Sequence, residues 1–102
     1  MPLYHIVLIK LKPSVPQEIL DEFSKRAKAM VTKVPGVLKV DVNGPLTATK
    51  HRAQGYGMGL VAVLEKPEDL TGYATHPAHL YAQELREQIC EDVLAYDMEF
   101  PG

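Results

Sequence analysis

The first apolar segment of the chain, Leu3–Leu11, is rich in branched apolar residues and predicts a β-strand. Successive side chains of a strand point to opposite faces, and both sets are largely apolar here. A strand of this kind is stable only where both of its faces are covered, so it predicts a sheet that is packed on two sides. The third predicted strand, Tyr56–Leu64, is apolar on both faces too, although two glycines lie on one of them. Glycines in a strand interior are costly unless another group packs closely against them.

Hydrophobic periodicity predicts four strands and two main helices. The order is β-α-β-β-α-β, which is the α+β, ferredoxin-like arrangement in which helices cover one face of a four-stranded antiparallel sheet. We expect residues 1–102 to form one domain, because half of this chain could not build an adequate core. The predicted strands are Leu3–Leu11, Gly36–Asn43, Tyr56–Leu64 and Val93–Phe100, and the predicted helices are Gln17–Lys33, a short turn at Glu68–Tyr73, and His76–Asp92, with a polar loop at Leu46–Gln54.

The face of the sheet away from the helices is also predicted to be apolar. An uncovered apolar face of this extent is typical of an association surface. A homodimer joined sheet to sheet is the simplest solution, since a two-fold interface closes on itself. The alternative, that a few of these side chains are simply exposed, stays open. The side chains expected on this face are Tyr4, Ile6, Leu8, Val61 and Val63.

Composition excludes several other classes of protein. The formal net charge is −2, and nothing indicates the basic face that nucleic-acid binding requires. No stretch approaches the roughly 18 apolar residues of a membrane span, so no membrane partner is expected. Cys90 is the only cysteine, which rules out an intrachain disulfide; we expect it to be a buried thiol on the apolar side of the second helix. With no signal pattern at the N-terminus, the expected location is the cytoplasm.

The residues best suited to chemistry lie in the segment from Tyr73 to His79. Pro77 suits the first position of a helix, so His76 is predicted near the N-cap and His79 in the first turn. Free N–H groups and the helix dipole favour a neutral imidazole there, which could accept a proton. Tyr73, on the turn before, could bring a phenol to the same place. His5, on the helix-covered face of the first strand, needs a partner or a cavity.

Other interpretations of these residues remain open at this point. Each could be purely structural: a capping histidine, a satisfied core histidine, or a tyrosine that only packs. His5, His76 and His79 could also form a three-imidazole zinc site, although spacing of three across a proline is unusual and no acidic residue clearly joins. His51, on the polar loop, is expected to be solvated.

A set of motifs along the chain resembles the stress-responsive dimeric A/B barrel (Dabb) family, over essentially its whole length. The motifs are His5 in an opening strand that ends Ile9–Lys12, then Pro35-Gly36-Val37, Tyr73, His76-Pro77-Ala78-His79, and Tyr96-Asp97. The resemblance implies a ferredoxin-like protomer and a homodimer whose two sheets form a dimeric α+β barrel. The family includes stress proteins with no established reaction. It also includes polyketide cyclases of the olivetolic acid cyclase type, which close a linear poly-β-keto thioester by an intramolecular aldol reaction.

The resemblance to these cyclases implies a set of site residues. Tyr73 and His79 match the catalytic pair, and His5 and His76 match two flanking histidines. A further cavity histidine of the cyclase falls at Met58, which implies a more apolar wall here. The residues expected to bound the substrate pocket are Val7, Phe23, Met58 and Leu60.

Two functions follow from this resemblance. The favoured one is an enzyme in which His79 removes a proton from a carbon next to a carbonyl and Tyr73 donates a hydrogen bond to the carbonyl oxygen. Its ligand would be a small hydrophobic or polyketide-like molecule. No cofactor and no metal are needed, because a β-keto substrate has already acidified carbons. The alternative is a non-catalytic stress-responsive dimer whose cavity only holds an apolar ligand. A weaker third possibility is a purely structural assembler.

Overall fold

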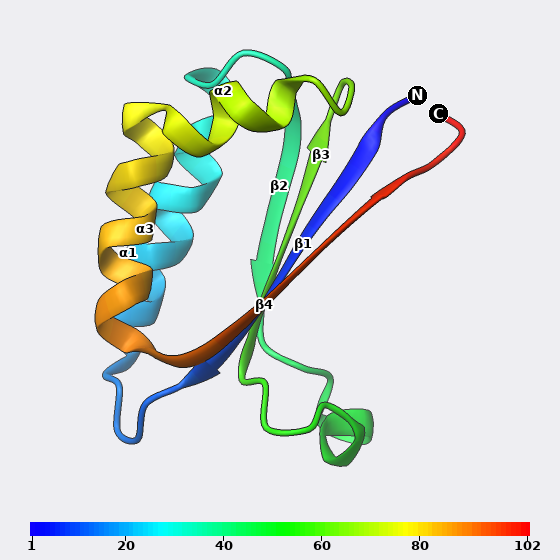
Figure 1. Ribbon diagram of the computed structural model, residues 1–102. Coiled ribbons are helices and arrows are strands. Elements are labelled where there is room, and N and C mark those ends of the chain that lie inside the picture. Colours follow the sequence, from blue (N-terminus) through cyan, green and yellow to red (C-terminus); the bar gives the residue numbers. More distant parts are fainter.

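The computed structural model describes residues 1–102 as a four-stranded antiparallel sheet with helices on one side (Figure 1). The strands lie in the order β2-β3-β1-β4, so the first strand is central and the last forms an edge. The predicted α+β class and the βαββαβ order are confirmed. The strands are β1 (Leu3–Leu11), β2 (Val37–Asn43), β3 (Met58–Leu64) and β4 (Cys90–Glu99), and the helices are α1 (Gln17–Lys28), α2 (Asp69–Thr75) and α3 (Pro77–Ile89).

Two element boundaries differ from the sequence prediction. Helix α3 ends at Ile89 rather than near Asp92, because Cys90 takes an extended conformation and already pairs with Leu11 of β1. Cys90 is therefore the half-buried first residue of β4 and does not lie on a helix face. The first helix ends at Lys28 and continues as a 3₁₀ turn, Ala29–Thr32.

The last strand begins at Cys90, three residues before the predicted Val93, and the other predicted elements differ by at most two residues at each end. The segment predicted as a polar loop contains an exposed 3₁₀ turn, Thr47–Arg52, which includes the solvated His51. The helical turn expected at Glu68–Tyr73 is the short helix α2. Shifts of this size are usual where helix ends tighten into 3₁₀ geometry or fray.

Helix α1 buries its apolar face against the sheet and against α3. Pro16 precedes the helix in an extended conformation, acidic Glu18 lies in the first turn, and basic residues fill the last turn, as the helix dipole favours. Phe23 and Ala27 are buried, and Met30 continues the same stripe into the 3₁₀ turn. The core therefore lies between α1 and the half of the sheet formed by β2 and β3.

The two glycines of the third-strand region have close neighbours, as the sequence led us to expect. A Cβ atom on Gly59 would lie 3.4 Å from Cδ2 of Leu8, and one on Gly57 would lie 3.2 Å from Cδ1 of Leu11. An added Cβ at Gly57 would require Leu11 to move by a few tenths of an ångström, whereas one at Gly59 would be at the edge of ordinary van der Waals contact. The glycines thus let the side chains of β1 lie flat across β3.

The sheet face opposite the helices is apolar and uncovered (Figure 1). The strand register places Tyr4 beside Met98, Ile6 beside Tyr96, and Leu8 beside Leu94. Leu94, Tyr96 and Met98 are 42%, 58% and 44% exposed. No helix is long and apolar enough to cross a membrane. The location in the cytoplasm stays a prediction.

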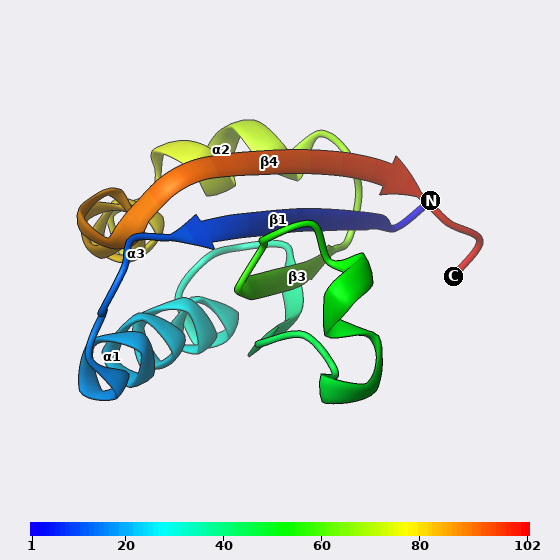
Figure 2. The same cartoon turned by 90° about the horizontal axis from the view of Figure 1, so that it is seen from below.

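On the helix side, β4 is left without a cover. Figure 2 shows β4 beside β1 along one edge of the sheet, with α1 on the opposite flank. The residues of β4 that share the helix-side face with His5 and Val7 of β1 are Asp97 and Ala95, and both are exposed. The space between this half of the sheet and helices α2 and α3 is the cavity that forms the candidate site.

Candidate active site

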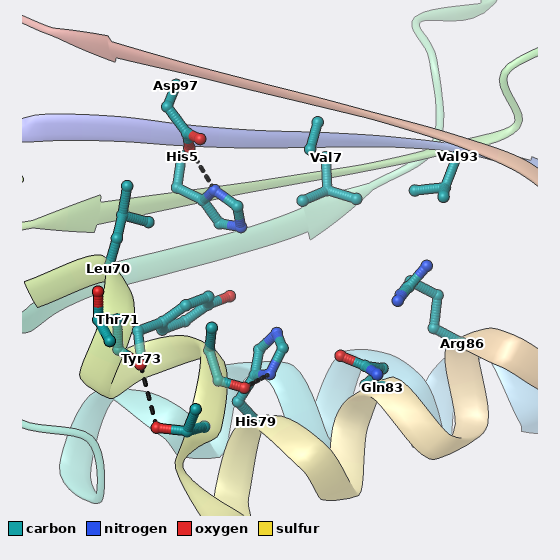
Figure 3. A pocket seen from close by; sticks show the side chains of 13 residues that line it. His5, Val7, Leu70, Thr71, Tyr73, His79, Gln83, Arg86, Val93 and Asp97 are labelled. Atoms are coloured by element: carbon teal, nitrogen blue, oxygen red, sulfur yellow. Dashed lines mark hydrogen bonds and ion pairs between the residues drawn. The ribbon is translucent and has the colours of Figure 1, made fainter.

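A cavity of about 560 Å³ lies between the β1–β4 half of the sheet and helices α2 and α3 (Figure 3). This size is within the range of pockets that hold small organic ligands. Its walls carry both apolar and titratable side chains, and a smaller hollow adjoins it toward the core. The residues that give the cavity its chemistry are His5 of β1, Tyr73 of α2, His79, Gln83 and Arg86 of α3, and Asp97 of β4.

The sharp turn between α2 and α3 brings Tyr73 and His79 together. Helix α2 ends at Thr75, and Pro77 at the first position of α3 restarts the helix in a new direction. The ring centroids of Tyr73 and His79 are 4.6 Å apart, with the planes tilted by 51°. The predicted phenol–imidazole pair is therefore present at one cavity.

A backbone hydrogen bond sets the tautomer of His79. Its Nδ1 lies 3.0 Å from the carbonyl oxygen of Ala74. A carbonyl can only accept, so Nδ1–H donates and the proton is on that nitrogen. The lone pair of Nε2 is then free of contacts within the chain. This imidazole is oriented to accept a proton through Nε2.

The pKa values of the two residues move in the directions that acid–base work needs. Burial lowers the pKa of His79, and the positive charges of His5 and Arg86 lower it further, against the opposing effect of the Ala74 hydrogen bond. Burial, with the negative charge of Asp97, raises the pKa of Tyr73 to about 12, against the opposing effect of Arg86. Near neutral pH, His79 is thus unprotonated and Tyr73 keeps its proton.

His5 lies on the other side of the Tyr73 ring. The ring centroids are 5.1 Å apart in an edge-on arrangement, with an interplanar angle of 71°. Nδ1–H of His5 donates to Oδ1 of Asp97 at 2.5 Å, across the β1–β4 pairing. The sequence led us to expect a partner or a cavity for His5, and the structure provides both: Asp97 is the partner, and the ring lines the cavity. Asp97 holds the His5 ring so that its other nitrogen, Nε2, is turned toward the cavity.

The fourth residue of the predicted group, His76, does not line the cavity. Its Nδ1 accepts a hydrogen bond of 3.0 Å from the backbone N–H of Ala78, so it is the N-cap of α3. The predicted N-cap position is confirmed, but the structure does not bring His76 to Tyr73 and His79. The arrangement of three imidazoles needed for the alternative zinc site is not formed, and no group of three or more His, Cys, Asp or Glu side chains could hold a metal ion.

The four predicted pocket residues fall in different places. Val7 lines the cavity, and Phe23 and Leu60 line the smaller hollow that adjoins it. Met58 lines neither: it is 8% exposed in the core and pairs with Ile9, toward the opposite end of β1 from His5. The more apolar wall expected at Met58 is therefore not a wall of this cavity.

Sequence reasoning missed several side chains of the cavity, chiefly Asp97, Gln83 and Arg86. A signal for the last two exists, because positions 79, 83 and 86 follow the i, i+4, i+7 spacing of one helix face. Asp97 was part of the Tyr96-Asp97 motif, but its approach to His5 was not predicted, since it depends on the register of two strands that are far apart in sequence.

The fold and the site together define a ferredoxin-like α+β protein with a phenol–imidazole pair at a cavity on the helix side of its sheet. The chain belongs to the stress responsive A/B barrel domain (Dabb) family, which it matches over residues 3–100. The family resemblance drawn from the sequence is confirmed.

Individual relatives agree with this assignment. The chain is 25% identical over 97 residues to olivetolic acid cyclase of Cannabis sativa, and the match covers 95% of each chain. It is similar to a dimeric protein of unknown function with a ferredoxin-like fold from Bacteroides fragilis, with a TM-score of 0.82, 26% identity, and coverage of 97% and 96%. It also has the fold of hydroxynitrile lyase from Passiflora edulis, with a TM-score of 0.83, 18% identity, and coverage of 98% and 97%.

Proposed function

We propose that this protein is a small, cofactor-independent enzyme that transfers protons on a carbonyl compound, with an intramolecular aldol cyclisation of a poly-β-keto substrate as its reaction. The observation that carries the proposal is the pairing of Tyr73 with His79 at one cavity, 4.6 Å between ring centroids, with Nε2 of His79 free. The Tyr73 hydroxyl also makes no hydrogen bond within the chain, so it is available to a ligand. The similarity to olivetolic acid cyclase supports the reaction class.

The chemistry proceeds in two steps. Nε2 of His79 takes a proton from a carbon between two carbonyls, and the Tyr73 O–H donates a hydrogen bond to the oxygen that becomes the enolate. The enolate carbon then attacks a second carbonyl carbon of the same chain, which forms the C–C bond. The oxygen of that carbonyl takes up the proton from His79, so the imidazole returns to its neutral form. No electrons are gained or lost, and every proton is accounted for.

The test uses a synthetic N-acetylcysteamine thioester of a linear poly-β-keto acid, with deuterium exchange at the acidic carbons followed by NMR. The cyclised product is an isomer of the substrate, so it is separated by liquid chromatography and identified by NMR. His79→Ala and Tyr73→Phe should each lower the rate by about 10²-fold or more, as acid–base residues do. Circular dichroism of both variants checks that they are folded. Exchange and cyclisation at unchanged rates in both variants would rule out this role for the pair.

We further propose that two copies of the chain associate through the open sheet face as a homodimer. The exposed apolar side chains on this face support the proposal, because a partner copy would bury them, and the Bacteroides fragilis relative is dimeric. Leu94→Lys, in the centre of the face, should yield monomers in sedimentation velocity. Leu80→Lys is a matched control, since Leu80 is similarly exposed (48%) but lies on α3. Equal effects of the two substitutions would contradict this interface.

A second candidate function is a non-catalytic dimer that holds a small ligand. The observation in its favour is the part-apolar lining of the cavity by residues such as Val7, Leu70 and Val93, which could retain a ligand without turnover. It predicts that ligands raise the melting temperature without forming product. It also predicts that His79→Gln, which keeps a polar side chain but removes the base, leaves that stabilisation intact.

A further inference from the structure

Arg86 lines the cavity without a partner. It lies on α3, seven residues beyond His79, and its side chain points from the helix toward the sheet (Figure 3). The residue is only partly exposed, yet no carboxylate or carbonyl oxygen of the chain lies within hydrogen-bonding or ion-pairing distance of its guanidinium. The acidic residue that lines the same cavity, Asp97, is already paired with His5.

The other arginine near these helices shows what a satisfied guanidinium looks like here. Arg26 donates to Oε2 of Glu22 at 2.9 Å and to the carbonyl oxygen of Tyr81 at 3.0 Å. Its guanidinium also lies 3.8 Å from the centre of the Tyr81 ring. Arg26 therefore has a structural role between α1 and α3, whereas Arg86 has none within the chain.

An unpaired, partly buried guanidinium is costly, because it loses contact with water and gains no partner. Its five donors form a planar fork that matches a carboxylate. The site offers one cation, and no lysine or second arginine lines the cavity. A single guanidinium suits a monoanionic carboxylate better than a phosphate dianion, whose sites usually combine several donors or cations.

We propose that Arg86 binds a carboxylate of the substrate, so that the substrate is a carbonyl compound with an acid group at a distance from the reacting carbon. Seven residues of helix separate Arg86 from His79 by about 10 Å along the axis, so several carbon atoms lie between the two groups. Gln83 lines the cavity between them. This inference rests on the proposed function for the reacting carbonyl, but the anion site itself does not depend on turnover.

The experiment compares binding of octanoate and octanamide, which have the same length and shape but differ in charge, by isothermal titration calorimetry. Wild type should bind octanoate about tenfold or more tightly than octanamide, as expected for hydrogen bonds to a charged group. Arg86→Gln should bring the two affinities close together, and Arg86→Lys should retain part of the preference. Arg52→Gln is the matched control, because it removes the same charge from an exposed position outside the cavity and should change nothing.

The outcomes separate this inference from the proposed function. In His79→Ala the preference for octanoate should persist, since Arg86 is intact, and it should persist even if the protein turns over no carbonyl compound. If proton exchange depends on His79 but the protein binds octanoate no more tightly than octanamide, the proposed function stands and the role of Arg86 is overturned. A wild-type protein that binds the two probes equally, or neither of them, also overturns it, as does a preference that survives in a folded Arg86→Gln variant.

Discussion

The helix side of the sheet has two halves that differ in how they are filled. Over β2 and β3, helix α1 supplies fully buried apolar side chains such as Phe23, which pack against the sheet. Over β1 and β4, no helix packs against the edge strand, and the space is an open cavity with His5, Tyr73, His79 and Arg86 on its walls. The uncovered half is where polar and titratable side chains are tolerated.

The two halves also differ in how their polar groups are satisfied. No polar or charged residue of the chain is fully buried, so the apolar core half has none to satisfy. In the cavity half, His5 is paired with Asp97 and His79 with the Ala74 carbonyl, each through one nitrogen. The second nitrogen of each ring, together with the Tyr73 hydroxyl, has no partner in the chain. The cavity half is thus organised, but it is incomplete without a ligand.

The largest effect should come from Phe23→Ala in the core half. Phe23 is 2% exposed, and its truncation should lower the free energy of unfolding by about 3–5 kcal/mol through lost burial and a residual hole. Val93→Ala, on the cavity wall at 39% exposed, should cost about 1 kcal/mol or less. Urea unfolding followed by circular dichroism measures both. Similar losses in the two variants would show that the halves do not differ in packing.

The second effect concerns pH, since only the cavity half contains a group with a lowered pKa that the reaction uses. In the proposed reaction His79 acts as its base form, so the rate should stay level down to pH 6.5 and fall tenfold per unit only below the lowered pKa. Tyr73 adds no alkaline limb below about pH 12. A pH–rate profile, with an NMR titration of His79, makes the measurement. An acid limb with its midpoint at or above pH 6.5 would contradict the structure.

The same shift predicts the pH dependence of stability. The unfolded chain binds a proton on His79 near pH 6.5, whereas the folded protein resists it until the lowered pKa is reached. Between these two values the unfolded state holds more protons, so stability falls as the pH falls. His79→Gln should remove this part of the dependence, which urea unfolding at several pH values can detect.

Most of the fold could be predicted from the sequence because it depends on local periodicity, and so could the Tyr73–His79 pair, which lies within seven residues across one turn. The position of a residue along a strand is harder to predict. Alternation showed that Met58 shares the helix-side face with His5, but His5 pairs with Ala62, four residues and about 13 Å farther along β3. The contact of His5 with Asp97 likewise depended on the register of β1 with β4, which no local pattern determines.

The smallest effect concerns His76, which the sequence grouped with the cavity histidines and the structure places at the helix cap. His76→Ala should lower the free energy of unfolding by about 1 kcal/mol, because the N–H of Ala78 loses its acceptor. His76→Asn should restore most of that stability, since asparagine is a strong N-cap and carries no imidazole. Both variants should keep the wild-type rate of proton exchange. If His76→Asn is as stable as wild type but loses activity, His76 acts on the reaction and the division between cap and cavity is wrong. If both variants stay active, the proposed reaction needs only the histidines that line the cavity, His5 and His79.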